Sequence, residues 1–122
     1  MIKVIVAGSR NFDNYDLLKE NLLYYLQRYD LTTVEIVSGT ARGADSLGER
    51  FAMEYGCKIK RFPADWNKYG KKAGYIRNRQ MAEYADACVC FWDGKSKGTK
   101  WMIELAKQKG LNLRIVLFDD KE

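Results

Sequence analysis

The chain has 122 residues, of which 47% are hydrophobic and 30% charged. This is the composition of one ordinary globular domain, and it excludes a disordered or fibrous chain. No apolar run approaches the ~20 residues that span a membrane, and the N-terminus MIKVIVAGSR lacks the small-residue cleavage site of a signal peptide. We therefore expect a single domain over residues 1–122, in the cytoplasm.

The net charge of +5 is concentrated in one segment. Residues 58–79 carry eight basic side chains and one acidic side chain, Asp65, which gives +7. Such a concentration indicates an anionic partner. For the individual lysines, the alternative is a solvated loop.

Histidine is absent, which excludes the Ser-His-Asp and Cys-His mechanisms. Three cysteines without histidine are too few ligands for a zinc site. Cys88 and Cys90 are two residues apart on a predicted strand, so both point to the same face. Together with Cys57, they are expected to be buried thiols rather than disulfides.

Apolar β-rich runs alternate with helical patterns along the whole chain. The predicted elements are strand 3–8, helix 14–29, strand 33–39, helix 43–56, strand 57–64, helix 74–85, strand 86–93, helix 99–110 and strand 112–118. In the first helix, the expected buried face contains Leu18, Leu22, Tyr25 and Tyr29.

This alternation predicts an α/β, Rossmann-like three-layer sandwich. We expect a five-stranded, mostly parallel sheet in the order 3-2-1-4-5, with helices on both faces. In that order the chain reverses between the first and fourth strands, and ligands bind beyond the carboxyl ends of the strands at this point.

Four loops follow the first four strands and should meet at that edge of the sheet. They are GSRNF (8–12), SGTARGAD (38–45), PADWNKYGKKAGYIRN (63–78) and DGKSKGT (93–99). Together they bring glycines, serines and basic residues to one crevice, with Phe12, Trp66, Tyr69 and Trp92 as expected aromatic walls. No single loop contains the triphosphate-binding or dinucleotide fingerprint. Their convergence indicates a site for a nucleotide, which offers both a phosphate and a flat base.

The chain resembles the SLOG superfamily, which unites DprA/SMF proteins with the Lonely Guy phosphoribohydrolases. VAGSR followed by SGTARGAD is similar to the Gly-Ser-Arg and Ser-Gly-x-Ala-x-Gly-x-Asp motifs of the DprA branch. RNRQMAEYADACVCFWDGKSKGT is similar to the Lonely Guy segment, with Arg77 four residues before Met81 and Gly98-Thr99 at the loop end. The resemblance implies a Rossmann-like fold and a nucleotide-related ligand. It also leaves open a homodimer, for which Leu23, Tyr24 and Trp101 offer apolar side chains.

The sequence departs from the Lonely Guy pattern at the residue that implies catalysis. Those enzymes carry a Glu three residues after the Thr of the loop, where this chain has Met102. Glu104 cannot replace it, because two residues along a helix turn about 200°. Met102 is expected in the core with Leu105 and Ala106, so the loop is predicted to hold a ligand.

Asp93 is the best candidate for a catalytic carboxylate, with Arg77 holding the phosphate. No cofactor is predicted, although Asp93 could hold a Mg²⁺. Asp45 is expected to cap the second helix or to orient the preceding turn. Arg79 is expected to be an exposed helix residue, whereas Arg77 and Arg10 are the preferred phosphate ligands.

The candidate ligand-binding residues come from all four loops. They are Gly8, Ser9, Arg10, Ser38, Gly39, Thr40, Arg42, Gly43, Asp45, Trp66, Asn67, Arg77, Asn78, Gly94, Ser96, Gly98 and Thr99.

Three functions remain open at this point. The first is a sensor or binding domain for a nucleotide or nucleotide-derived ligand. The second is a nucleotide hydrolase of the phosphoribohydrolase type, using Asp93 and Arg77. The third is single-stranded nucleic-acid binding through residues 58–79.

Overall fold

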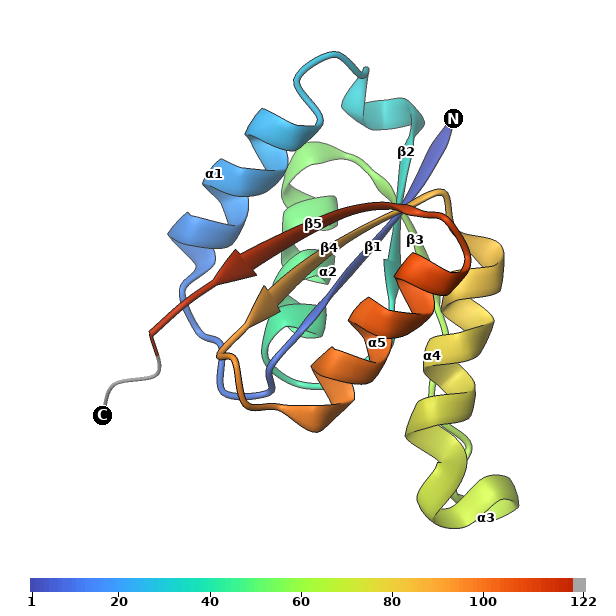
Figure 1. The fold of residues 1–122 in the computed structure, drawn as a ribbon. Helices are drawn as coiled ribbons and strands as arrows, with labels where there is room; N and C mark the ends of the chain where they lie inside the picture. Colours follow the sequence, from blue (N-terminus) through green and yellow to red (C-terminus); the bar gives the residue numbers. More distant parts are fainter. Residues whose placement is uncertain (120–122) are drawn as a thin grey trace.

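The apolar β-rich runs form a sheet of five parallel strands. In the computed structural model, which describes residues 1–119, these are β1 (Ile2–Gly8), β2 (Val34–Ser38), β3 (Lys58–Arg61), β4 (Ala87–Trp92) and β5 (Asn112–Leu117). The strand order is β3-β2-β1-β4-β5, and every neighbouring pair is parallel (Figure 1). The predicted order and fold class are confirmed.

Helices cover both faces of this sheet. The longer ones are α1 (Tyr15–Tyr25), α2 (Ala44–Tyr55), α4 (Ala73–Tyr84) and α5 (Lys97–Gln108), and the short ones are η1 (Leu31–Thr33), α3 (Trp66–Tyr69) and η2 (Gly70–Lys72). One layer contains α1 and α2, and the opposite layer contains α4 and α5 (Figure 1).

The core has two halves, one on each face of the sheet. Val4 and Val6 of β1 pack toward α1 and α2, whereas Ile5 and Ala7 pack toward α4 and α5. Successive strand side chains point to opposite faces, so a strand that is buried on both faces reads as a continuous apolar run. This is why β1 could be predicted from KVIVAG.

The first helix is shorter than predicted. α1 ends at Tyr25 instead of residue 29, and its buried stripe continues from Leu18 and Leu22 to Leu26. Tyr29 is exposed. The predicted and the observed buried stripe agree up to Leu22. After α1 the chain turns, and the Asp30 side chain accepts a hydrogen bond from the Thr32 amide at the start of η1.

Two boundaries near the predicted crevice also differ. β3 ends at Arg61, before the proline, and residues 66–72 fold into α3 and η2 where no helix was predicted. α5 begins at Lys97, two residues before the predicted start at 99. Gly98 and Thr99 therefore belong to the first turn of a helix.

The exposed aromatic side chains proposed for a homodimer do not share one surface. Tyr24 is exposed on α1 and Trp101 is exposed on α5, and these helices lie in opposite layers (Figure 1). Within residues 1–119, no helix has the length and apolarity needed to cross a membrane.

Candidate functional site

A cavity of about 410 Å³ opens where the chain reverses between β1 and β4. We call it the switch-point cavity. Its lining comes from the end of β1, from the loops after β1, β2 and β4, and from α2, α4 and α5: Ala7, Gly8, Ser9, Arg10, Asn11, Ala41, Arg42, Asp45, Arg77, Asn78, Met81, Asp93, Ser96, Gly98, Thr99 and Met102. This is the position at which open α/β sheets bind ligands.

A second cavity, of about 430 Å³, lies beside the first. We call it the Trp66 cavity. It is lined by Arg10, Gly39, Thr40, Ala41, Arg42, Pro63, Ala64, Trp66 and Arg77. The Trp66 side chain is 53% exposed, so much of its indole is free for contact with a ligand.

Three arginines line both cavities, and we call them the arginine wall: Arg10, Arg42 and Arg77. None of the three takes part in the ion pairs of residues 1–119, which involve other basic side chains. Arg79, by contrast, pairs with Glu83 on the surface of α4, as expected. The arginine wall therefore provides positive charge that no carboxylate in contact neutralises.

Arg77 is the buried member of the arginine wall. Its Nε donates to Asn78 Oδ1 over 2.9 Å, and its Nη1 donates to the carbonyl of Gly39. Burial lowers the pKa of the guanidinium, and the charge of Asp45 acts in the opposite direction. A Cβ at Gly39 would lie 2.7 Å from Oδ2 of Asp45 and 2.8 Å from Nη1 of Arg77, so a larger residue there would displace these two side chains.

Asp45 supports the loop that carries Gly39. Its carboxylate accepts a hydrogen bond from the Ala41 amide over 3.2 Å, and the residue is only 5% exposed. Burial raises its pKa to about 6, although the Ala41 hydrogen bond and the charge of Arg77 oppose the shift. Asp45 makes no capping hydrogen bond at α2. It orients the turn, which is one of the two roles that the sequence left open.

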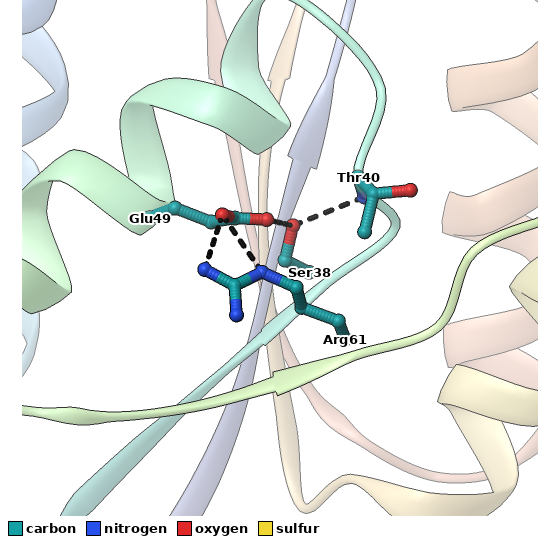
Figure 2. Close-up of polar contacts among 4 residues, drawn as sticks. All are labelled: Ser38, Thr40, Glu49 and Arg61. Carbon is teal, nitrogen blue, oxygen red and sulfur yellow. Dashed lines mark hydrogen bonds and ion pairs between the residues drawn. The ribbon is translucent and has the colours of Figure 1, made fainter.

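A polar network fixes the same turn from its other side (Figure 2). The hydroxyl of Ser38 donates to Glu49 over 2.6 Å and accepts from the Thr40 amide over 3.0 Å. Arg61 of β3 completes the network, with its Nη2 3.0 Å from Glu49. Thr40 has a φ of 64°, which is unusual outside glycine, and the network holds it there. The Thr40 hydroxyl points away from Glu49 in Figure 2.

Close backbone contacts join the loops after β1, β2 and β4. Gly43 has a φ of 81°, and a Cβ there would lie 2.5 Å from the carbonyl oxygen of Ser9. At Gly8 a Cβ would lie 2.2 Å from the carbonyl oxygen of Phe91. Only glycine allows these approaches, so both residues bring the site together without presenting a side chain to a ligand.

Asp93 folds the loop after β4 around its own carboxylate. Oδ1 accepts from the amides of Lys95 and Ser96 over 2.9 and 2.8 Å. Burial raises the pKa of Asp93, but these hydrogen bonds outweigh burial and leave the pKa below its ordinary value. The amides of Lys95 and Ser96 therefore donate within the loop itself. This geometry favours an ionised acceptor over a general acid.

Most of the predicted site residues line the two cavities. Those that do are Gly8, Ser9, Arg10, Gly39, Thr40, Arg42, Asp45, Trp66, Arg77, Asn78, Asp93, Ser96, Gly98 and Thr99. Those that line neither cavity are Ser38, Gly43, Asn67 and Gly94. The sequence analysis did not assign seven further lining residues to the site, and their types carry no functional signal of their own: Ala7, Asn11, Ala41, Pro63, Ala64, Met81 and Met102.

Of the four aromatic side chains expected to line the crevice, Phe12, Tyr69 and Trp92 line neither cavity. Phe12 is 2% exposed and stacks on Phe91 at 4.9 Å between ring centroids, so it belongs to the core. Trp92 uses its Nε1 to donate to the carbonyl of Ser96 over 3.1 Å. Trp66 is therefore the aromatic residue that a ligand can reach in these cavities.

Met102 is buried with Leu105 and Ala106, and Glu104 is exposed on the other side of α5, as predicted. The side chain of Met102 also contributes to the apolar lining of the switch-point cavity, beside Met81. No group of three or more acidic or cysteine side chains that could hold a metal ion occurs in the described part of the chain.

Comparisons with known proteins agree with this architecture. The chain is 34% identical over 129 residues to the Gene 61 protein of Mycobacterium phage D29, which covers 99% of both chains. Its fold matches the X-ray structure of DNA processing protein A (DprA) from Streptococcus pneumoniae with a TM-score of 0.73 and 19% identity. That match covers 100% of this chain and 52% of the DprA chain, so this chain spans about half of its structural neighbour.

The family assignment rests on the N-terminal half of the sequence. The sequence model of the YspA, cpYpsA-related SLOG family (YAcAr) matches residues 2–69, which contain both the GSR and the SGTARGAD motifs. The resemblance to the SLOG superfamily is thus confirmed. The chain belongs to the YspA, cpYpsA-related SLOG family.

Proposed function

We propose that this protein binds a nucleotide or a nucleotide-derived small molecule at the carboxyl edge of its sheet. The observation that carries the proposal is the arginine wall, whose three guanidinium groups face two cavities without an ion-pair partner in residues 1–119. Guanidinium groups bind phosphate oxygens through paired hydrogen bonds, which makes arginine the preferred residue for phosphate recognition.

The surroundings of the arginine wall favour a nucleotide over inorganic phosphate. Trp66 offers a flat aromatic surface on one side. On the other side, the lining of the switch-point cavity includes Ser9, Asn78 and Thr99, whose hydroxyl and amide groups are of the kind that bind sugar hydroxyls. Small-molecule sites combine such a concave, partly apolar space with a few polar groups.

Binding is a better description than hydrolysis for this site. The Asp93 carboxylate is engaged by the amides of its own loop and keeps a low pKa. A general acid needs a pKa near the working pH. The position of the Lonely Guy glutamate is occupied by Met102, which is buried. A sensor or binding domain therefore remains our first proposal.

Thermal unfolding with a nucleotide panel tests the proposal. A ligand at ~100 times its dissociation constant adds about 2.7 kcal/mol to the free energy of unfolding, which raises the midpoint clearly. We expect one or more phosphorylated nucleosides to raise the midpoint, and Arg10→Gln to abolish the rise, because Arg10 is exposed and lines both cavities. Arg79→Gln is the matched control, since Arg79 is exposed outside the cavities.

The proposal fails if no phosphorylated nucleoside changes the midpoint. It also fails if Arg10→Gln responds to the ligand as the unchanged protein does. Base release from a nucleoside monophosphate that disappears in Asp93→Asn would instead identify a hydrolase.

A second candidate, single-stranded nucleic-acid binding, is supported by exposed aromatic side chains among basic residues. Tyr75 and Trp101 form an edge contact at 6.0 Å between ring centroids on the surface of α4 and α5. Bases stack on such rings, and the backbone is held by cations. This function requires affinity that falls steeply with salt, because phosphate contacts release counterions. Binding that is insensitive to salt excludes it.

A further inference from the structure

The position of the arginine wall between two cavities bears on the kind of ligand. Arg10, Arg42 and Arg77 line the switch-point cavity and the Trp66 cavity alike, and Ala41 is the only other residue common to both within residues 1–119. The positive charge therefore lies at the centre of the combined space. Open space continues from it in two directions.

Each of the two cavities is large enough to hold a nucleoside. Their volumes are about 410 and 430 Å³, and both fall within the roughly 300–1,000 Å³ of small-molecule sites. An anion on the arginine wall thus has room for one organic group on each side. A nucleotide with a terminal phosphate fills only one of the two cavities.

Apart from the arginine wall, the lining of the two cavities is unsuited to a second phosphate. The lining of the switch-point cavity includes Asp93, whose low pKa keeps it negatively charged. Its neighbouring amides, Lys95 and Ser96, already donate to that carboxylate. In the Trp66 cavity the remaining lining is Pro63, Ala64, Trp66 and the Gly39–Thr40 turn, without a further cation. The rest of each cavity suits a base or a sugar.

Trp66 is placed for stacking close to the charge. A Cβ at Gly74 would lie 3.6 Å from the Trp66 ring and 3.9 Å from Nη2 of Arg77, so indole and guanidinium flank the same glycine. Nη2 makes no hydrogen bond in the described chain, whereas Nε and Nη1 of Arg77 are both engaged. The free nitrogen is thus available to an anion beside the aromatic ring.

We infer that the ligand is a dinucleotide whose phosphate or pyrophosphate lies on the arginine wall, with one nucleoside in each cavity. The inference rests on the proposed function and specifies its ligand class. It distinguishes a molecule with an internal phosphate from a mononucleotide with a terminal one.

Calorimetric titration with three related compounds tests this inference. Diadenosine 5′,5′-pyrophosphate is the two-sided probe, and ADP and AMP are its one-sided counterparts. We expect the two-sided probe to bind at least about tenfold more tightly than ADP, since a stacked base contributes that much to affinity. Trp66→Ala should remove this advantage, Trp66→Phe should keep most of it, and Tyr24→Ala, on the exposed surface of α1 and outside both cavities, should leave it unchanged.

A second variant tests the use of the switch-point cavity. Gly98 lines the switch-point cavity, and a Cβ there meets no atom within 4 Å, so Gly98→Val adds bulk without a clash in the protein. We expect Gly98→Val to weaken the two-sided probe by about tenfold or more. If both variants reduce its affinity, both cavities are in use.

The outcomes separate this inference from the proposed function. Equal affinities for the two-sided probe and ADP, with both lost in Arg10→Gln, overturn the inference and leave the proposed function standing. Absence of binding by all three compounds, or binding that survives in Arg10→Gln, counts against both. A longer single-stranded oligoadenylate that binds more tightly than the two-sided probe overturns the dinucleotide in favour of nucleic acid.

Discussion

Asp45 is the residue in which burial and charge oppose each other most directly. Its carboxylate is almost fully buried, and burial raises its pKa to about 6, above the ordinary value of 3.8. The folded protein therefore binds this proton more tightly than the unfolded chain does. The resulting stabilisation is complete at pH values below the ordinary pKa and is lost as the pH rises through the folded pKa.

Asp45→Asn should remove this pH dependence. The amide oxygen of asparagine can still accept from the Ala41 amide, but the side chain no longer ionises. A shift of this size corresponds to about 3 kcal/mol, so the variant should gain up to that amount relative to the original protein between about pH 4 and pH 7. Urea unfolding across this pH range measures the difference. Asp13→Asn, at an exposed position, is the control, and a difference that does not change with pH contradicts the prediction.

At single residues, the sequence predicted chemistry better than orientation. Arg10, Arg77 and Trp66 were selected for their types and loop positions, and all three line the cavities. Phe12 was misassigned because a phenylalanine in a loop after a strand can turn into the core or toward the crevice. Whether Asp93 faces a ligand or its own loop depends on a local backbone turn, which composition does not specify.

The turn after β2 shows how an element is held by its neighbours. Thr40 lies at a φ of 64°, where a residue other than glycine costs about 1–2 kcal/mol. The Ser38 hydroxyl and Glu49 carboxylate offset that cost from one side, and Asp45 does so from the other. The carbonyl of Gly39 is thereby aimed at Arg77.

Ser38→Ala should loosen this turn. The Thr40 amide loses its acceptor and the Glu49 carboxylate loses its donor, and losing hydrogen bonds of this kind costs about 1–3 kcal/mol. We expect a loss of that size in the free energy of unfolding by urea, with weaker binding of any nucleotide that the unchanged protein binds. Ser46→Ala, on the exposed side of α2, should change neither quantity. An unchanged urea midpoint in Ser38→Ala shows that the network does not support the turn.

Elements with a continuous or periodic apolar pattern were predicted well, and short polar elements were not. β1 and β4 are buried on both faces, so continuous apolar runs identified them. α3 and η2 consist of exposed and half-buried residues with four lysines or glycines among seven, and they carry no apolar period. Their fold depends on the Asp65 carboxylate, which accepts from the Lys68 amide at the start of α3.

At the scale of the whole molecule, the sheet and its helices enclose Cys88 and Cys90 completely. Both residues are 0% exposed, and their sulfur atoms lie 3.4 Å apart beneath α4 and α5. The hydrogen bond to Cys90 and burial raise the pKa of the Cys88 thiol. Because β4 lies between β1 and β5 and is buried on both faces, these thiols should react only when the domain unfolds.

Thiol labelling followed by mass spectrometry should therefore report global unfolding. We expect Cys88 and Cys90 to be modified together, at least about 100-fold more slowly than in the urea-unfolded chain. Cys57, at the end of α2 and 9% exposed, should be modified first. Modification of Cys88 as fast as that of Cys57 would mean that β4 opens locally.

The convergence of the four loops could be predicted from the strand order, whereas the two cavities could not. A parallel sheet brings the loops after β1, β2, β3 and β4 to one edge, whatever their side chains are. That the same three arginines, Arg10, Arg42 and Arg77, line two cavities is a result of side-chain packing, which the sequence pattern does not specify.

The shared wall also makes the two cavities thermodynamically dependent on each other. Arg10, Arg42 and Arg77 line both cavities, so the protein has one set of positive charges for the two. Two separate mononucleotides would bring two phosphates to the same guanidinium groups and repel each other there. An anion bound in one cavity thus lowers the affinity of the other cavity for a second anion. The site as a whole accepts one anionic centre at a time.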